Sequence, residues 1–214
     1  MTAGGSRRRS RSSPQRARAP RLSAAERRTQ LLDVARRVFA DRGFASASVE
    51  EIAARAGVSK PVVYEHFGGK DGVYSVVVQR EIRELVGRIE ASLRPGHPRA
   101  TIVDAVDTFL RYVEEEPDGF IVLMRDAPIG PDSATLPSVL DEVARAVEKL
   151  LVVELKQRGY ERRIAPVLAR CLVGMIAVPG QWWIQTGKRR REDVAEQIVN
   201  LAWNGLSGLR PTGE

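Results

Sequence analysis

The chain has 214 residues and a mass of 23.6 kDa, with 43% hydrophobic and 29% charged residues. This composition is typical of a globular protein with one sizeable domain, or with a small domain joined to a larger one. No uninterrupted apolar run approaches the ~20 residues of a membrane helix, and no apolar stretch follows the N-terminal arginines, so we expect neither a membrane anchor nor a secretory signal. One cysteine, Cys171, and two distant histidines, His66 and His97, exclude an internal disulfide and a His-rich metal enzyme. We therefore expect a cytoplasmic protein with no catalytic site, metal or cofactor.

The formal net charge of +7 is concentrated in the first 22 residues. They contain seven arginines and no Asp or Glu, so the rest of the chain sums to zero. A segment rich in Ser, Pro and Arg buries too little apolar surface to fold, and we expect residues 1–22 to form a disordered tail. Cationic arms attract phosphate backbones in a salt-dependent way. Assistance in DNA binding and a solubilising leader are both compatible with this charge.

Three short helices are expected directly after the tail. Ser23 and Glu26 have the spacing of a capping box, and the apolar stripe that follows ends near Gly43, which accepts the left-handed conformation of a helix end. A second capping box, Ser48 with Glu51, opens a short helix that ends at Gly57. Ser59 is placed to cap a third helix, with Pro61 in its first turn, where a missing N–H costs nothing. This arrangement, with an Ala-Gly-Val corner, predicts a helix-turn-helix.

The rest of the chain predicts a larger helical body. One long helix is expected at about 71–93, where apolar positions step by three or four residues. Others are expected at about 100–115, 136–158, 161–186 and 191–206, with a short apolar segment at 120–124 and a loop at 128–133. Strand-like alternation is absent. The predicted fold class is all-α, with an N-terminal helix-turn-helix domain at 23–70 and a helical effector-binding and dimerisation domain at 71–214.

Residues 48–74 read SVEEIAARAGVSKPVVYEHFGGKDGVY and closely resemble the DNA-binding segment of the TetR family of bacterial transcriptional regulators. The family pattern is a capped helix with Ile-Ala, then Ala-Gly-Val-Ser, Tyr, His-Phe and a following Lys. Its elements here are Ser48, Ile52-Ala53, Ala56-Gly57-Val58-Ser59, Tyr64, His66-Phe67 and Lys70. The resemblance implies a homodimer that binds a palindromic operator in double-stranded DNA.

The same motif assigns DNA contacts to individual residues. Lys60 offers a mobile cation, and the capped helix start at Ser48 favours a phosphate. Pro61 and Val62 can make only apolar contacts, for example with a thymine methyl, so hydrogen-bond readout of bases should be sparse. Outside this motif, Tyr64 would be read as a packing residue and His66 as a surface residue. The expected DNA contacts are Ser48, Ser59, Lys60, Pro61, Val62, Val63, Tyr64, His66 and Lys70.

By resemblance, the dimer interface lies on the last two long helices, which pair with their copies as a four-helix bundle. Small side chains on the penultimate helix allow close approach, and the last helix carries an apolar stripe. The alternative is that these stripes face only the core of their own subunit. The expected interface residues are Gly174, Ala177, Val194, Ile198 and Leu201.

An effector pocket is expected where Val178-Pro179-Gly180 interrupts the penultimate helix. Trp182 and Trp183 follow, so one indole should face inward and the other outward or toward the partner. A lining with few charges favours a small lipophilic effector, although plain core packing is the alternative for each residue taken singly. The expected lining is Phe109, Val113, Phe120, Met124, Leu172, Met175 and Trp182. Scattered Gly-Met, Trp and Trp-Gly-Leu positions also resemble the family's regulators of fatty-acid synthesis genes, which implies an acyl-CoA effector.

The sequence is compatible with several functions. The favoured one is a regulator, most simply a repressor, in which effector binding moves the long helix that starts directly after the DNA motif. An enzyme with a lipid substrate lacks the support of paired carboxylates, a Ser-His-Asp set or a metal cluster. An effector-independent architectural DNA binder would rest on the arginine tail. A transcriptional activator of lipid-metabolism genes is the remaining alternative.

Overall fold

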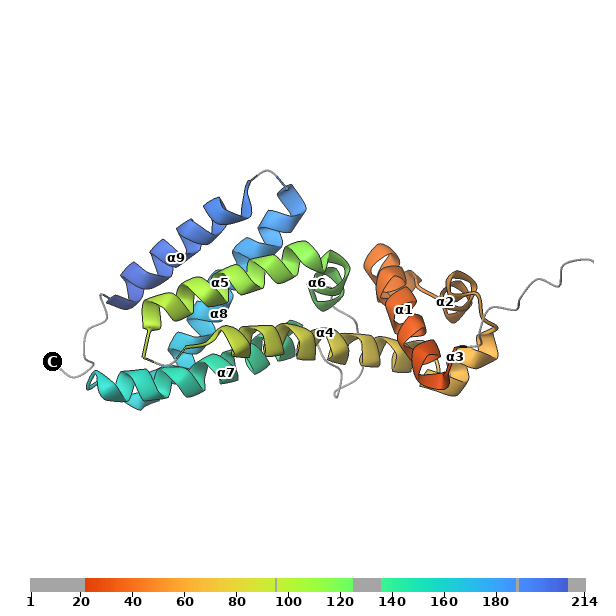
Figure 1. The fold of residues 1–214 in the computed structure, drawn as a ribbon, viewed down its shortest axis with the longest axis horizontal. Coiled ribbons are helices and arrows are strands. Elements are labelled where there is room, and N and C mark those ends of the chain that lie inside the picture. Colours follow the sequence, from red (N-terminus) through yellow and green to blue (C-terminus); the bar gives the residue numbers. More distant parts are fainter. Residues whose placement is uncertain (1–21, 95, 125–135, 188, 208–214) are drawn as a thin grey trace, which may run out of the picture.

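The computed structural model describes residues 22–94, 96–124, 136–187 and 189–207, and within these ranges every regular element is helical (Figure 1). The all-α prediction is confirmed, and each predicted helix lies within a few residues of an observed one. The expected disordered tail and the loop at 128–133 lie outside the described residues, except for Leu22. The elements are α1 (Ala24–Ser46), α2 (Val49–Ala56), α3 (Lys60–Phe67), α4 (Lys70–Ser92), α5 (Pro98–Glu115), α6 (Pro117–Met124), α7 (Leu136–Gln157), the 3₁₀ turn η1 (Arg162–Ile164), α8 (Ala165–Thr186) and α9 (Arg191–Ser207).

The molecule is elongated, with a small head at one end and a larger body at the other (Figure 1). Helices α1, α2 and α3 form the head, and α5 to α9 form the body. Helix α4 belongs to both, because it begins at the end of α3 and runs along the body beside α7 and α5. Helix α1 packs against α4 and α6, so the head and the body share a contact surface as well as a helix.

Local sequence signals account for most of the head. Ser23 and Glu26 form the complete capping box, with the Ser23 N–H donating to Glu26 Oε2 at 2.7 Å and the Glu26 N–H donating to Ser23 Oγ at 3.2 Å. Gly43 (φ 74°) breaks the regular path of α1, which then continues for one short turn to Ser46. Gly57 (φ 66°) closes α2 in the left-handed conformation. These three signals were readable because each involves residues close together in the chain.

Two capping predictions need correction. The Ser48 hydroxyl accepts from the Glu51 N–H at 3.1 Å, but the Glu51 carboxylate pairs with Arg55 and Arg42 instead of completing a second capping box. The Ser59 side chain makes no capping hydrogen bond at the start of α3. Helix α3 therefore depends on tertiary packing more than on its own cap.

The corner between α3 and α4 is unusually tight. Gly68 and Gly69 both have positive φ, and a Cβ on Gly72 would lie 1.8 Å from the carbonyl oxygen of Phe67. Only glycine fits at this position, because the first turn of α4 lies directly against the last turn of α3. The direction of α4 therefore fixes the direction of α3.

Helix α8 has two apolar faces. By length and composition alone, the stretch Arg162–Thr186 would pass as a membrane-spanning candidate, with a mean hydropathy of 1.5. One face packs on α5, α7 and α9, while Val167, Val178 and Trp182 point outward and are 63%, 65% and 48% exposed. The helix also continues through Pro179 to Thr186, so the predicted interruption at residues 178–180 does not end it.

Candidate DNA-binding surface and effector pocket

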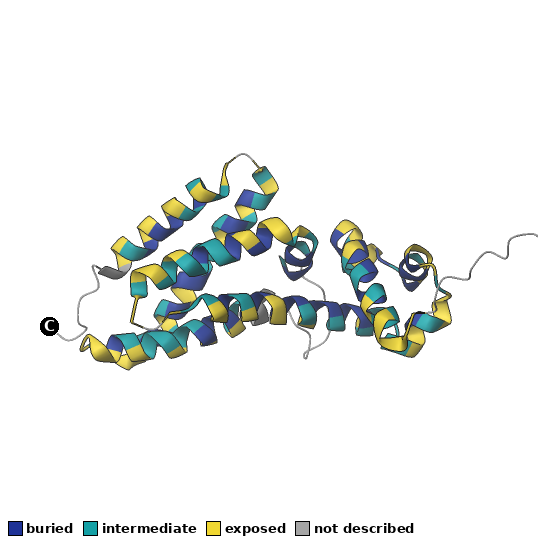
Figure 2. Ribbon diagram, viewed as in Figure 1, coloured by how far each residue is buried: buried dark blue, intermediate teal, exposed yellow. Residues whose placement is uncertain are grey.

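Helix α3 presents a free edge at the tip of the head. Lys60, Pro61, Tyr64 and Glu65 are exposed, and these positions recur on one side of a helix. Exposed residues colour much of the head's far end in Figure 2. The opposite side carries Val63, which is fully buried. A short helix held by its back against a domain, with its outer edge in solvent, has the form needed to enter a major groove.

Charge on this edge is partly masked in the free protein. The Lys60 ammonium donates a hydrogen bond to the Glu50 carboxylate of α2 and lies 5.6 Å from the centre of the Tyr64 ring. The hydrogen bond with Glu50 raises the pKa of Lys60 and lowers the pKa of Glu50. Lys60 therefore stays positive, and a DNA phosphate would compete with Glu50 for it.

Two of the nine predicted DNA contacts are wrong in the role assigned to them. Val63 is 0% exposed and fills the core of the head, so it cannot reach base edges. The Lys70 ammonium donates to the carbonyl oxygens of Phe44, Ala45 and Ala47 at 3.0, 3.4 and 3.2 Å, and it lies over the Phe44 ring. With its donors engaged on the end of α1, Lys70 positions the head instead of binding phosphate.

The structure adds a positioning residue that sequence reasoning missed. Arg28 of α1 donates to the His66 carbonyl oxygen at 2.6 Å and stacks over the Phe67 ring at 4.4 Å. These contacts hold the C-terminal end of α3, while Val63 anchors its middle. No local pattern could indicate this role, because the two partners are 38 residues apart.

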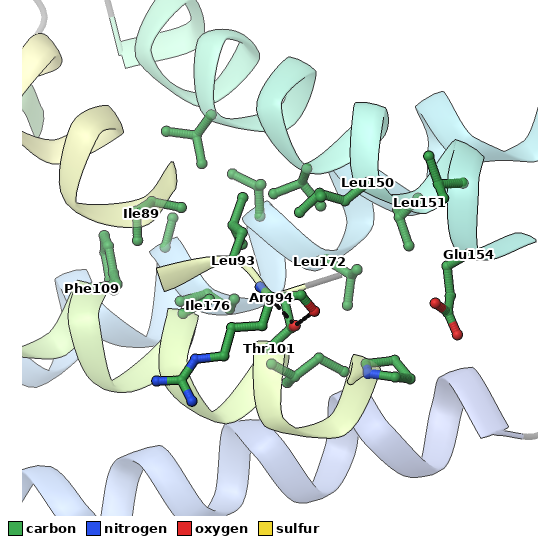
Figure 3. Close-up of a pocket in the computed structure, with 18 of the residues that line it drawn as sticks. Ile89, Leu93, Arg94, Thr101, Phe109, Leu150, Leu151, Glu154, Leu172 and Ile176 are labelled. Carbon is green, nitrogen blue, oxygen red and sulfur yellow. Dashed lines mark hydrogen bonds between the residues drawn. The ribbon is translucent and has the colours of Figure 1, made fainter. Parts of the chain in front are cut away.

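A cavity of about 250 Å³ lies in the body between α4, α5, α7 and α8 (Figure 3). Each helix contributes apolar side chains, such as Ile89, Phe109, Leu151 and Ile176, and the surface that faces the cavity is almost entirely carbon. An apolar cavity of about 150 Å³ stays dry and can bind benzene, so a larger one can accept an alkyl or ring system. This cavity can therefore bind a hydrocarbon group by burying it away from water.

Polar groups are confined to the end of the cavity farthest from the head. Arg94 and Thr101 lie close together there, with the Thr101 hydroxyl donating to the Arg94 carbonyl oxygen at 2.7 Å (Figure 3). The Arg94 guanidinium pairs with Asp104 at 2.9 Å, and Glu154 of α7 also lines this end. A ligand with a long apolar part and a polar end would match this distribution.

The predicted pocket residues were mostly the wrong ones. Phe109 and Leu172 do line the cavity. Val113 and Phe120 are 1% and 2% exposed and belong to the solid core, while Met124, Met175 and Trp182 are not among the lining residues. The main omission was α7, whose side chains Val143, Val147 and Leu151 form a wall at four-residue spacing.

The predicted dimer residues also divide into two groups. Ala177, Val194 and Ile198 are buried within the subunit, where Ala177 lines the cavity and α9 packs on α5. Leu201 is 63% exposed. The outer face of α8 instead carries a stripe of exposed residues on both sides of the partly buried Gly174, which we call the α8 stripe: Val167, Cys171, Val178 and Trp182.

The two tryptophans behave as predicted. Trp183 is buried and donates its indole N–H to the Arg189 carbonyl oxygen at 2.8 Å, while Trp182 points outward. Next to them, a Cβ on Gly180 would lie 2.4 Å from the Phe109 ring. Gly180 thus lets α8 approach α5 closely, directly behind a ring that lines the cavity.

Comparison with known proteins identifies the family. The model for bacterial regulatory proteins of the tetR family matches residues 31–77, and the model for the tetracyclin repressor-like C-terminal domain matches residues 98–205. The chain belongs to the TetR family. It is a DNA-binding transcriptional regulator, and the family assignment also implies dimerisation through the C-terminal domain.

Individual TetR-family relatives cover nearly the whole chain. The HTH-type transcriptional activator FasR of Mycolicibacterium smegmatis is 36% identical over 193 residues, which are 87% of this chain and 86% of FasR. The HTH-type transcriptional repressor KstR2 of Rhodococcus jostii is 25% identical and covers 85% of this chain and 91% of its own. The crystal structure of a TetR-like regulator from Rhodococcus sp. RHA1 is 30% identical, with a TM-score of 0.69, covering 88% of this chain and all of that one.

TetR-family membership also answers the question of catalysis, because these proteins are regulators and not enzymes. In the described part of the chain, no group of three or more His, Cys, Asp or Glu side chains is placed to hold a metal ion.

Proposed function

We propose that this TetR-family regulator is a cytoplasmic homodimer that binds a palindromic operator and whose operator affinity is set by a small lipophilic molecule in the α4–α5–α7–α8 cavity. One observation carries the proposal. The cavity wall includes Leu85 and Ile89 of α4, and the other end of α4 forms the tight corner that fixes α3. A single helix therefore touches both the ligand space and the DNA-reading element.

DNA binding is assigned to the free edge of α3 and the capped start of α2. Tyr64 and Lys60 supply hydrogen-bonding and cationic groups, and Pro61 with the half-buried Val62 supplies apolar surface. We assign phosphate contacts to Ser59, whose hydroxyl makes no capping bond, and to the N-terminus of α2 at Ser48. His66 borders the same surface.

Dimerisation is assigned to the α8 stripe together with Leu201 of α9. The exposed residues of the stripe recur at helical spacing along one face of α8, and on a regulator of two-fold DNA sites such a face fits a second copy. Gly174 in the middle of the stripe allows close helix approach. Pairing must place two α3 helices about 34–36 Å apart, or a multiple of that distance, to read successive major grooves.

The ligand is proposed to be a long-chain acyl compound, with its hydrocarbon in the cavity and its polar end near Arg94 and Thr101. The apolar walls exclude a ligand that places polar or charged groups inside the cavity. Burying an unpaired charge beside apolar side chains costs more free energy than the contacts provide. We assign the acyl chain of an acyl-CoA to the cavity and its charged headgroup to the solvent beyond the exposed Arg94.

Ligand binding acts by selecting one orientation of α4. If the cavity is better shaped for the ligand in one orientation, ligand shifts the population toward it, and α3 follows through the Gly72 corner. The size of the effect equals the difference in ligand affinity between the two orientations.

The direction of regulation is a separate matter. One relative is a transcriptional activator and another a transcriptional repressor, although both match most of this chain.

 The position of the operator relative to the promoter decides whether the bound dimer blocks or assists the polymerase. Ligand control of operator affinity can therefore lead to repression or to activation. Repression is the simpler mode, since a dimer on a promoter needs no further contact, while the 36% identity with FasR favours activation as the second candidate. A reporter assay with and without the regulator separates the two.

The test of the proposal is a binding titration with a DNA site that the purified protein selects from genomic fragments. Palmitoyl-CoA should change the operator Kd by about 5–150-fold, the usual range of coupling between two sites. Ala105→Phe, which fills the cavity, should weaken palmitoyl-CoA binding, whereas Ala100→Phe on the exposed side of the same helix should not. Equal palmitoyl-CoA affinity in both variants would overturn the assigned cavity.

A further inference from the structure

We propose that Glu81 and Tyr112, together with Arg36 and Arg80, form the joint that transmits the state of the cavity to the DNA-binding head. This inference rests on the proposed function, and it assigns a positioning role to four residues that touch neither ligand nor DNA. We call these four residues the Glu81 joint.

Glu81 is the one charged residue that is buried in the described part of the chain, at 2% exposure. Its Oε2 atom accepts from the Tyr112 hydroxyl at 3.3 Å and lies 3.5 Å from Arg36 Nη1, while Oε1 accepts from Arg80 Nε at 3.3 Å. Burial, reinforced by the Glu81 charge, raises the pKa of Tyr112, so its hydroxyl remains a donor. A buried carboxylate with three partners is costly to maintain unless its geometry is kept.

The partners of Glu81 come from both parts of the molecule. Arg36 belongs to α1 of the head and also donates to Glu116, at the end of α5, at 2.6 Å. Arg80 of α4 reaches back to Asp33 of α1 at 2.8 Å. Tyr112 belongs to α5 of the body. The joint therefore connects α1 of the head to the two body helices α4 and α5.

Residues of the joint and of the cavity wall lie on consecutive turns of the same two helices, α4 and α5. Leu85, which lines the cavity, follows Glu81 by one turn of α4, and Phe109, also a lining residue, precedes Tyr112 by one turn of α5. A ligand that changes the spacing of α4 and α5 at Leu85 and Phe109 must change the spacing of Glu81 and Tyr112. The head responds because Arg36 follows the carboxylate.

Two features favour discrete arrangements of the joint over gradual deformation. A Cβ on Gly119 of α6 would lie 2.2 Å from Glu81 Oε2, so the carboxylate is tightly enclosed. Arg36 Nε is buried without a hydrogen-bond partner, so the observed arrangement leaves one donor unsatisfied. A second arrangement that satisfies this donor would differ in its contacts with the head.

The experiment uses Tyr112→Phe, which removes one hydroxyl and keeps the ring, with Tyr160→Phe in the body as the matched control. The measured quantity is the coupling factor, the operator Kd with saturating palmitoyl-CoA divided by the Kd without it. We expect Tyr112→Phe to bring this factor to within about twofold of one, while the palmitoyl-CoA Kd stays close to that of the unaltered protein. Tyr160→Phe should leave the factor unchanged.

A second variant and a denaturant titration separate transmission from folding. Glu81→Gln should also abolish coupling, and urea unfolding of each variant shows whether the protein remains folded under the binding conditions. A folded Tyr112→Phe or Glu81→Gln protein with the full coupling factor would overturn the joint.

A ligand-independent arm keeps this inference distinct from the proposed function. Ala105→Phe fills the cavity from within, and we expect it to change hydrogen exchange in the 31–40 segment of α1. The change should disappear when Tyr112→Phe is added. If palmitoyl-CoA does not bind, the proposed ligand class is wrong, but the hydrogen-exchange measurement still tests the Glu81 joint. An α1 change of equal size in both backgrounds, or no change in either, overturns the joint.

Discussion

The head and the body build their functional surfaces in different ways. The DNA-reading edge comes from consecutive residues of one short helix, between Ser59 and Phe67, and its supports at Gly57 and Gly72 lie within a few residues. The cavity draws on α4, α5, α7 and α8, whose contributing residues span positions 85 to 177. A surface made by neighbours in the chain can be read from a motif, whereas a cavity exists only after distant helices have packed.

The largest effect should come from the corner that joins the two regions. Gly72→Ala places a methyl group against the Phe67 carbonyl, and we expect a loss of about 3 kcal/mol or more of stability, with loss of operator binding. Gly87→Ala is the matched control on the same helix, because nothing lies within 4 Å of its Cβ. It should stabilise α4 by about 0.5–1 kcal/mol. Urea unfolding measures both, and equal effects would contradict the account of the corner.

The next effect should come from the outer face of the body. Val178→Asp places two carboxylates in a two-fold interface, where each is desolvated without a partner, so the dimer should dissociate to monomers at micromolar concentration. Operator affinity should fall with it. Val103→Asp, on an exposed position of α5, is the control. Sedimentation velocity reports the oligomeric state, and a Val178→Asp dimer as stable as the unaltered one would remove the α8 stripe from the interface.

A smaller effect on operator affinity is expected from the exposed residues of α3 that we assign to DNA contacts. Tyr64→Ala and Lys60→Ala should each weaken operator binding by roughly tenfold, and Lys60→Ala should reduce the salt dependence of binding by about one phosphate contact. Lys156→Ala, an exposed lysine in the body, serves as the control. Fluorescence anisotropy at several salt concentrations provides the numbers. Unchanged affinity in both edge variants would contradict the assigned surface.

The smallest effect should have the opposite sign. Glu50→Gln releases the Lys60 ammonium and removes a negative charge beside the DNA, so operator affinity should rise by about two- to fivefold at low salt. The gain should shrink at high salt, since exposed charges are screened. An affinity that falls in Glu50→Gln would mean that the carboxylate supports the edge instead of competing with phosphate.

Sequence reasoning reached the helices and the reading edge but not the contacts that depend on packing. Capping residues, glycines and apolar spacing predicted the helix order, because these signals are local. Val63 was misassigned because a short helix has only one buried position to find, and Lys70 because a lysine after a DNA-binding motif has the same pattern whether it binds phosphate or a helix end.

The body shows the same limit more strongly. Apolar spacing predicts that a side chain faces inward, and it does not distinguish a solid core at Val113 from a cavity wall at Leu172. Val194 and Ile198 of α9 are buried in the subunit, where α9 packs on α5, while the exposed stripe lies on α8. Which face is buried depends on the angle at which the helices cross. The Glu81 joint is invisible in the sequence, since Tyr112 and Arg36 lie 31 and 45 residues away from Glu81 and only Arg80 is its neighbour in the chain.

The most direct test of the central account is reciprocal. The palmitoyl-CoA Kd of the unaltered dimer is measured with and without saturating operator DNA, and compared with the operator Kd measured with and without palmitoyl-CoA. Linkage between cavity and head predicts that the two ratios are equal and differ from one by at least about fivefold. A palmitoyl-CoA Kd that is the same on free and DNA-bound protein would contradict the account.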